Sequence, residues 1–227
     1  MSYLHQFVFG IYPYIALAIF LLGSLIRFDR EQYTWKSESS QLLHKGSLRT
    51  GNILFHVGIL GLFFGHAVGL LMPVWVWDAL GISHSLKQIV AMVAGGVMGG
   101  LCLIGILILL ARRFANDRLR AVTTFKDKIV MLWILATLLL GLFSIYASAS
   151  HTDGHVMVQL MNWAQHILTL RGGAAQFIAD APLIFKLHLF MGMSLFVIFP
   201  FTRLVHVWSG FGAVTYLGRA FQLVRRR

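Results

Sequence analysis

Cysteine and acidic side chains are scarce in this chain. Its 227 residues contain one cysteine, Cys102, and eight aspartates and glutamates. A single cysteine cannot build a disulfide, an iron–sulfur cluster, a cysteine zinc site or a thioether-linked haem within the chain. Charged residues make up 12% of the sequence and hydrophobic residues 58%, whereas a soluble domain carries about 25% charged residues. The composition therefore predicts one integral membrane domain covering residues 1–227.

Long apolar stretches account for most of the sequence. Five of them can cross about 30 Å of hydrocarbon at about 1.5 Å per residue. We expect an all-α integral membrane protein with five transmembrane helices, at residues 7–26, 52–72, 89–111, 129–148 and 183–208. A short amphipathic surface helix is expected around residues 155–170. None of the five stretches contains Asp or Glu, which proton relays and cation transporters generally need, so the pattern argues against a pump.

Positive charge is concentrated between alternate apolar stretches. Residues 27–49, 112–128 and 203–227 carry 16 of the 19 lysines and arginines. Because cytoplasmic loops of membrane proteins are enriched in Lys and Arg, we expect an outside N-terminus, a cytoplasmic C-terminus and a cytoplasmic tail at 209–227. The net charge of +11 then reflects membrane topology, and we expect no nucleic-acid partner.

Four histidines fall within two of the apolar stretches. His56 and His66 lie in the second, and His188 and His206 in the fifth. These two stretches run in opposite directions, so His56 and His206 should meet near the cytoplasmic face and His66 and His188 near the outer face. On one regular helix, His188 and His206 would also share a face. Because an imidazole in hydrocarbon is costly unless something satisfies it, each pair is a candidate binding site.

Isolated histidine pairs suit haem better than zinc. Zinc sites usually need three or four protein ligands close together. Haem iron already has four porphyrin nitrogens and needs two axial partners, which two neutral imidazoles can supply. The pattern predicts two bis-histidyl b haems, with iron bound by His56 and His206 in one leaflet and by His66 and His188 in the other. The alternative is interfacial histidines hydrogen-bonded to nearby backbone.

Three basic residues near the membrane faces have candidate roles. Lys87 stands at the outer start of the third stretch, close in depth to His66, and a quinol could give up its protons there, facing a free Nδ1 of His66. Arg112 and Arg203 lie at cytoplasmic helix ends, where they are candidates for neutralising haem propionates. The alternative for all three residues is snorkelling to the lipid headgroups.

Distinctive segments run along nearly the whole chain: FGIYPYIALAIFLLGS (9–24), QYTWKSESSQLL (32–43), NILFHVGILGLFFGH (52–66), AMVAGG (91–96), LHLFMGMSLFVIFPFTRLVHVW (187–208) and YLGRAFQLVRRR (216–227). Together they resemble the gamma subunit family of membrane-bound respiratory nitrate reductases, which are dihaem cytochromes b. The resemblance implies haem ligation by the four histidines and a role for Lys87 and His66 in oxidising quinol or menaquinol.

The resemblance also implies partners and a location. Electrons would pass to an iron–sulfur beta subunit and then to a molybdenum-containing alpha subunit that reduces nitrate, with this chain in the cell inner membrane. Loops 27–51 and 112–128 and the tail 209–227 are the expected docking surface. Two alternatives stay open: a related cytochrome b of a sulfur-metabolism or heterodisulfide-type menaquinol complex, and a haem-free membrane anchor.

Overall fold

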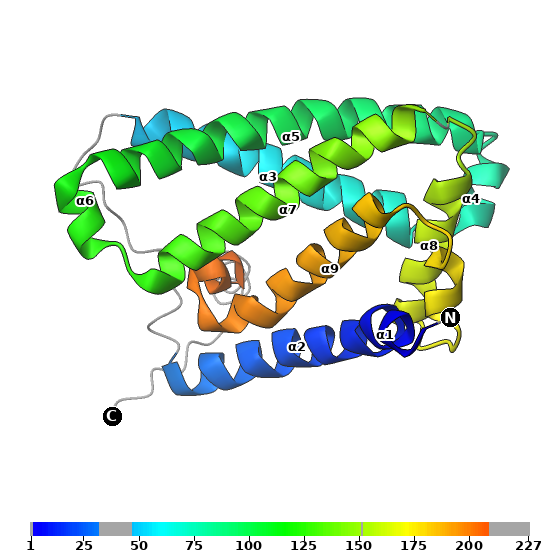
Figure 1. Ribbon diagram of the computed structural model, residues 1–227, viewed down its shortest axis with the longest axis horizontal. Coiled ribbons are helices and arrows are strands. Elements are labelled where there is room, and N and C mark those ends of the chain that lie inside the picture. The colour runs from blue at the N-terminus through cyan, green and yellow to red at the C-terminus, as the bar shows by residue number, and fades with distance from the viewer. Residues whose placement is uncertain (1, 32–46, 151, 209–227) are drawn as a thin grey trace, which may run out of the picture.

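The structure is a computed structural model that describes residues 2–31, 47–150 and 152–208. Throughout these residues the regular structure is helical, with no strand. Helical segments long and apolar enough to cross a membrane cover Tyr3–Glu31, Leu48–Leu71, His84–Ala115, Phe125–Ala149 and Leu183–Phe201. Figure 1 shows them running side by side along the long axis of the molecule. Within the described residues, the prediction of an all-α protein with five helices able to span a membrane is confirmed.

The elements of the described residues follow one another as short and long helices. In chain order they are α1 (Tyr3–Gln6), η1 (Phe7–Ile11), α2 (Tyr12–Glu31), α3 (Leu48–Leu71), α4 (Val74–Ala79), α5 (His84–Ala115), α6 (Asp117–Val122), α7 (Phe125–Ala149), α8 (His155–Leu168), η3 (Ala174–Ile178), α9 (Leu183–Ile198), η4 (Phe199–Phe201) and η5 (Arg203–Val205).

Helices α3 and α5 approach each other closely at two glycines. A Cβ built on Gly58 would overlap the backbone nitrogen of Cys102, and one built on Gly105 would overlap that of Phe55. Small residues let membrane helices approach this closely. Glycine on both helices therefore lets α3 pack tightly against α5.

Helix α8 covers one end of the bundle, next to α4 and the start of the first span (Figure 1). It matches the expected surface helix and buries Met161, Trp163, Ala164 and Ile167. Pro13 has no N–H to donate to the helix carbonyls before it. The indole Nε1 of Trp163 donates to one of them, the carbonyl of Phe9, at 2.9 Å. This bond fastens α8 to the first span.

The fifth span differs from the prediction. A single helix over residues 183–208 is wrong: α9 ends at Ile198, and the chain continues through η4, an extended Thr202 (φ −125°, ψ −178°) and η5. Pro200 explains the break, because proline cannot donate to the preceding turn and its ring clashes with it. His206 thus lies beyond the break, so it does not share one regular helix face with His188 and that expectation was wrong.

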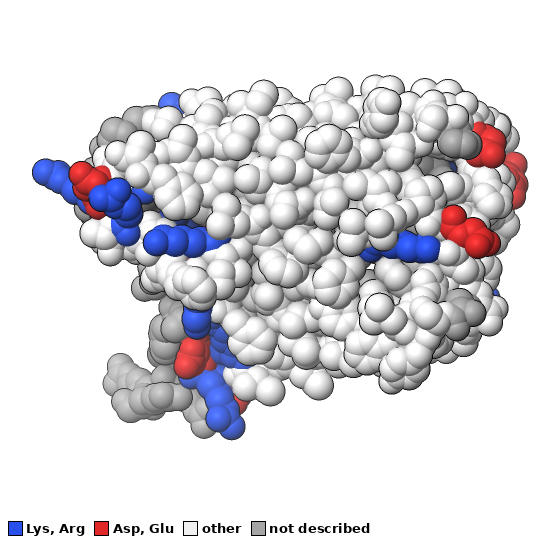
Figure 2. Space-filling model, in the orientation of Figure 1, with Lys and Arg blue, Asp and Glu red and all other residues white. Residues whose placement is uncertain are grey.

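Charge is distributed unevenly over the molecule. Figure 2 shows Lys and Arg mainly at the end where α6 and the last turn of α2 lie, while a broad middle zone carries almost none. This is the pattern expected of a chain that spans a bilayer with one basic face. The tail 209–227, the loop 32–46 and the cytoplasmic docking surface expected there lie largely outside the described residues.

Candidate functional site

The structure brings the four membrane histidines together in two pairs. The ring centroids of His56 and His206 are 6.2 Å apart, and those of His66 and His188 are 6.0 Å apart. These are the pairs expected from the directions of the second and fifth stretches. His206 reaches its partner even though the helix breaks before it, so the break does not separate the pair.

Each of the four imidazoles is held through Nδ1. The distance from Nδ1 to a backbone carbonyl oxygen is 2.8 Å from His56 to Asn52, 2.7 Å from His66 to Leu62, 3.0 Å from His188 to Thr137 and 2.6 Å from His206 to Arg203. A carbonyl can only accept, so Nδ1 carries the proton and Nε2 keeps its lone pair. This is the arrangement that orients a metal-binding histidine and leaves Nε2 as the ligand atom.

The ring separations fit one metal ion between each pair. A metal–imidazole bond is about 2 Å, and the nitrogen of a five-membered ring with bonds of about 1.33 Å lies about 1.1 Å from the ring centre. Two such imidazoles on opposite sides of one ion have centroids about 6.3 Å apart. The described residues contain no group of three or more His, Cys, Asp or Glu able to hold a metal. A group that brings its own equatorial ligands, as haem does, suits this arrangement.

Open space lies beside the histidines of α3 and α9. In the apolar 18-residue stretch of α3, only 6% is buried, against 22–28% for the corresponding stretches of the other four spans. A Cβ built on Gly65, Gly69 or Gly192 would meet no atom within 4 Å. Gly65 precedes His66, and Gly192 lies one turn after His188. A flat macrocycle could approach the backbone at such positions.

Helix α7 positions His188, although it contributes no histidine of its own. A Cβ built on Gly141 would lie 2.9 Å from Cε1 of His188, so the ring packs directly on the α7 backbone. The carbonyl of Thr137, one turn earlier, is the partner of Nδ1. His56, His66 and His206 instead use carbonyls three or four residues earlier in their own segment. Nothing in the sequence pattern singled out Thr137 or Gly141.

Lys87 lies in the first turn of α5 and is buried, with 6% of its surface exposed. Its Nζ donates to the carbonyl of Gly69 at 3.0 Å and to Sδ of Met161 at 2.6 Å. The same Nζ lies 4.5 Å from the ring centroid of Trp77, a cation–π contact. The ammonium group thus sits inside the cover formed by α4 and α8, and it does not snorkel to the surface.

One detail of the expected quinol site is wrong. Nδ1 of His66 is not free to face a quinol, because it is bonded to the carbonyl of Leu62 in the preceding turn. In a helix, a histidine ring can turn back to the carbonyl four residues earlier, and this local bond satisfies Nδ1 within the membrane. Lys87 is nevertheless near His66, because its Nζ donates to the carbonyl of Gly69, which lies three residues after His66 on α3.

The two candidate propionate contacts lie at the basic end. Arg112 is in the last turn of α5 and is 6% exposed. Arg203 donates from Nε to Oδ1 of Asp127 at 2.7 Å, and its own carbonyl accepts from His206. Asp127 is buried and also caps the N-terminus of α7 together with Thr124. The sequence reasoning missed Asp127, whose position three residues after Thr124 is a capping-box signal.

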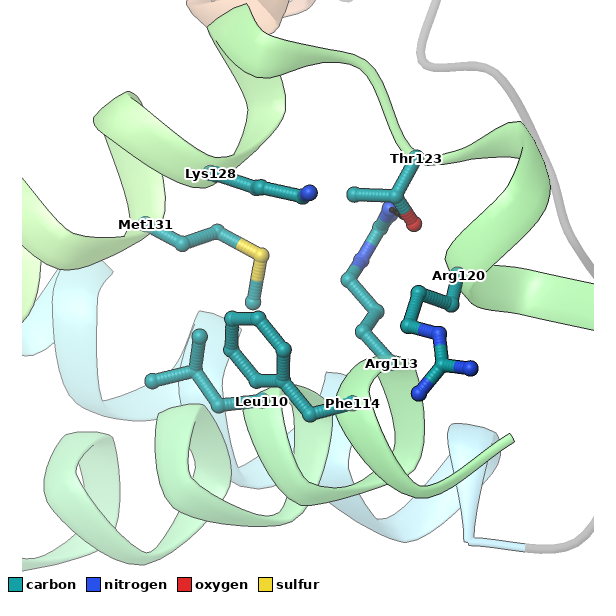
Figure 3. A pocket seen from close by; sticks show the side chains of 7 residues that line it. All are labelled: Leu110, Arg113, Phe114, Arg120, Thr123, Lys128 and Met131. Carbon is teal, nitrogen blue, oxygen red and sulfur yellow. Dashed lines mark hydrogen bonds between the residues drawn. The ribbon is translucent and has the colours of Figure 1, made fainter. Parts of the chain in front are cut away.

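A small hollow at the basic end contains none of the predicted site residues. Figure 3 shows it between α5, α6 and α7, with apolar side chains of Leu110, Phe114 and Met131 and the basic side chains of Arg113, Arg120 and Lys128 around it. Thr123 completes the lining and accepts from Nη1 of Arg113 at 3.3 Å. The hollow belongs to the 112–128 segment that the sequence marks as a docking surface.

Comparisons with known proteins agree over the full length. The family model described as "Nitrate reductase gamma subunit" matches residues 5–227. The chain is 48% identical over 227 residues to the "Respiratory nitrate reductase 1 gamma chain" of Escherichia coli (strain K12), covering 100% of both. It is 34% identical over 222 residues to the "Nitrate reductase gamma chain" of Bacillus subtilis (strain 168), covering 98% of each. It is also 31% identical to the "Nitrate reductase-like protein NarX" of Mycobacterium tuberculosis (strain ATCC 25618 / H37Rv), covering 95% of this chain and 33% of that protein.

Proposed function

The chain belongs to the family of nitrate reductase gamma subunits, and from that premise we propose that it is the dihaem, quinol-oxidising membrane subunit of a nitrate reductase complex. The resemblance expected from the sequence segments is confirmed at the level of this family. The single observation that supports the finer proposal best is the pair of histidine contacts, with ring centroids 6.2 Å and 6.0 Å apart.

His56 and His206 would hold one b haem near the cytoplasmic face, and His66 and His188 would hold the other near the outer face. When bound, the two haems supply one-electron carriers, one in each leaflet. The chain's own residues engage Nδ1 of each imidazole through the carbonyl bonds, which leaves Nε2 as the ligand atom. Because both histidines of each pair would be used to hold the haem, the chemistry supplied there would be electron transfer and not oxygen binding.

Lys87 is the proposed quinol contact. Within the described residues its buried ammonium group is bonded to two neutral acceptors, a carbonyl and a thioether, and so it can turn to a quinol oxygen without breaking an ion pair. Quinol or menaquinol oxidation releases two electrons and two protons and leaves the quinone. Lys87 and His66 stand at the outer side, so the protons leave directly to that side. A contact between quinol and Nδ1 of His66 would require displacing the Leu62 carbonyl.

The orientation follows from charge. The chain is a multi-pass membrane protein, and we place it in the cell inner membrane with the N-terminus outside and the basic end, with α6, in the cytoplasm. Lys and Arg near membrane helices favour the cytoplasmic side. This orientation puts Lys87 and α8 outside and the His56–His206 pair inside, as the direction of electron flow requires.

The partners at the cytoplasmic face are an iron–sulfur beta subunit and a molybdenum-containing alpha subunit. There nitrate accepts two electrons and two protons to give nitrite and water. Arg113, Arg120 and Lys128, around the hollow of Figure 3, belong to the basic surface that docks them. The names of the relatives, which are gamma chains of nitrate reductases, support these partners rather than those of a sulfur-metabolism complex.

Haem quantification of the purified chain tests the proposal. We expect two b haems per chain in a reduced-minus-oxidised spectrum, both reducible by menaquinol in membranes. In the assembled complex, quinol should then support nitrate reduction. A chain that folds in membranes without b haem would be a haem-free anchor, and quinol-reducible haems that never deliver electrons to nitrate would indicate the sulfur-type alternative.

A further inference from the structure

The break after α9 changes the backbone hydrogen bonding of the segment that leads to His206. Where Pro200 ends the helix, the carbonyls of this segment lose their usual amide donors, yet they lie within a membrane protein where unsatisfied carbonyls are costly. The segment must also keep one shape, because His206 follows within six residues of Pro200. The donor comes from another helix. Nη1 of Arg27, near the end of α2, donates to the carbonyls of Pro200 and Thr202 at 2.8 Å and 2.9 Å.

Arg27 is one member of a row on α2 that follows the break closely. Gly23, one turn earlier, leaves room for the proline ring: a Cβ there would lie 2.8 Å from Cγ of Pro200. Ser24 is buried, and its Oγ accepts from Nε1 of Trp208 at 3.3 Å, two residues after His206. The row thus contacts the chain on both sides of His206.

An aromatic contact extends the row toward the membrane centre. The ring of Phe20 lies 4.8 Å from that of Phe199 and 5.4 Å from that of Trp208, measured between centroids. Phe20, Gly23, Ser24 and Arg27 are spaced i, i+3, i+4 and i+7, so they share one face of α2. This face contacts the broken segment through an aromatic ring, a glycine that leaves room for the proline ring, a hydroxyl acceptor and a charged donor.

A second anchor comes from α7. Oδ1 of the buried Asp127 accepts from Nε of Arg203, and the carbonyl of Arg203 is the partner of Nδ1 of His206. The imidazole is therefore oriented by the carbonyl of Arg203, whose side chain is bonded to α7, while the carbonyls of Pro200 and Thr202 are bonded to α2. His206 opens a new helical turn after the break, at residues 206–208, and these contacts hold the segment that leads into it.

We propose that the Phe20–Arg27 row of α2 is a positioning template for His206, through the contacts of Gly23 and Arg27 with the broken segment at Pro200. The inference rests on the proposed haem function. It gives the first span, which carries no haem ligand, control over the geometry of the cytoplasmic haem site alone. Arg27, which the charge pattern assigns to membrane topology, acts in this account as a structural donor.

The test compares the two haem sites of the whole complex in membranes. We expect Arg27→Gln to shift the EPR signal and midpoint potential of the cytoplasmic haem, or to lose that haem, while the outer haem is unchanged. Arg27→Lys should move both readouts part of the way back, because lysine keeps a charged donor with a different reach. Gly23→Val should reproduce the shift without changing charge, since its side chain would push against Pro200.

Arg30→Gln is the matched control. Arg30 is exposed and lies three residues after Arg27 on the same helix. Its substitution removes the same charge as Arg27→Gln, and it should leave both haem signals as in the wild type. Unchanged cytoplasmic haem signals in both Arg27→Gln and Gly23→Val would overturn the inference, as would equal loss of both haems. A wild-type chain without any haem would instead overturn the proposed function on which the inference depends.

Discussion

The imidazole of His188 lies directly against the backbone of Gly141, so closely that a Cβ on Gly141 would be 2.9 Å from Cε1 of the ring. Helix α7 thereby acts on His188 as the row on α2 acts on His206. In both cases, a span that contributes no histidine to either pair sets the position of a paired histidine. The ring cannot move freely away, because its Nδ1 is bonded to Thr137 at 3.0 Å.

Replacing Gly141 by alanine should disturb the outer histidine pair selectively. The added methyl group would push the His188 ring and stretch its bond to Thr137, a form of overpacking that typically costs about 1–3 kcal/mol. We expect a shifted EPR signal for the outer haem and an unchanged cytoplasmic haem. Gly100→Ala is the control, because a Cβ at Gly100 meets no atom within 4 Å. Equal effects of the two substitutions would contradict this role for Gly141.

Replacing Lys87 by alanine should slow quinol oxidation and leave haem content intact. A hydrogen bond to a charged group is worth about 1.5–3 kcal/mol, which corresponds to a loss of roughly 10- to 160-fold in kcat/KM for quinol. The measurement is the rate of haem reduction by menaquinol in membranes, with dithionite-reducible haem quantified in parallel.

Arg171→Ala is a matched control for Lys87→Ala, because Arg171 is an exposed basic residue of the same expected outer side. It should keep the wild-type rate. A normal quinol rate in Lys87→Ala would show that this buried ammonium group serves packing around Met161 and Gly69 instead of quinol binding.

Deleting residues 212–227 should separate the membrane chain from its partners. These residues lie outside the described part of the chain, and the prediction rests on their sequence, which mixes Tyr216, Leu217 and Phe221 with four arginines. We expect both haems to remain in the membrane and to be reduced by quinol, while quinol-dependent nitrate reduction is lost. Full nitrate reduction by a membrane-bound complex carrying the truncated chain would rule out a docking role for the tail.

Much of the architecture could be predicted from the sequence because it follows from local patterns. Length and apolarity identify five spans, and counting their alternating directions pairs His56 with His206 and His66 with His188. The surface helix α8 follows from its amphipathic spacing. The capping signal of Thr124 and Asp127 was also readable, although its link to Arg203 was not.

What the sequence could not predict depends on contacts between distant segments. The bond of His188 to Thr137 spans 51 positions, and that of Arg27 to Thr202 spans 175. A proline within a helix weakens it in general, but the shape of the break at Pro200 depends on donors supplied by α2. The expectation of a free Nδ1 on His66 was wrong for a local reason, because the carbonyl of Leu62 lies within hydrogen-bond distance in the same helix.

The most direct test of the central claim is the haem content of four single variants, His56→Ala, His206→Ala, His66→Ala and His188→Ala, measured by EPR and redox titration of the membrane-bound complex. The account predicts loss in pairs. The first two variants should each lose bis-imidazole ligation of the cytoplasmic haem and keep the outer one, and the last two should do the reverse. Bis-imidazole ligation of the cytoplasmic haem that is lost in His56→Ala but retained in His206→Ala would contradict it.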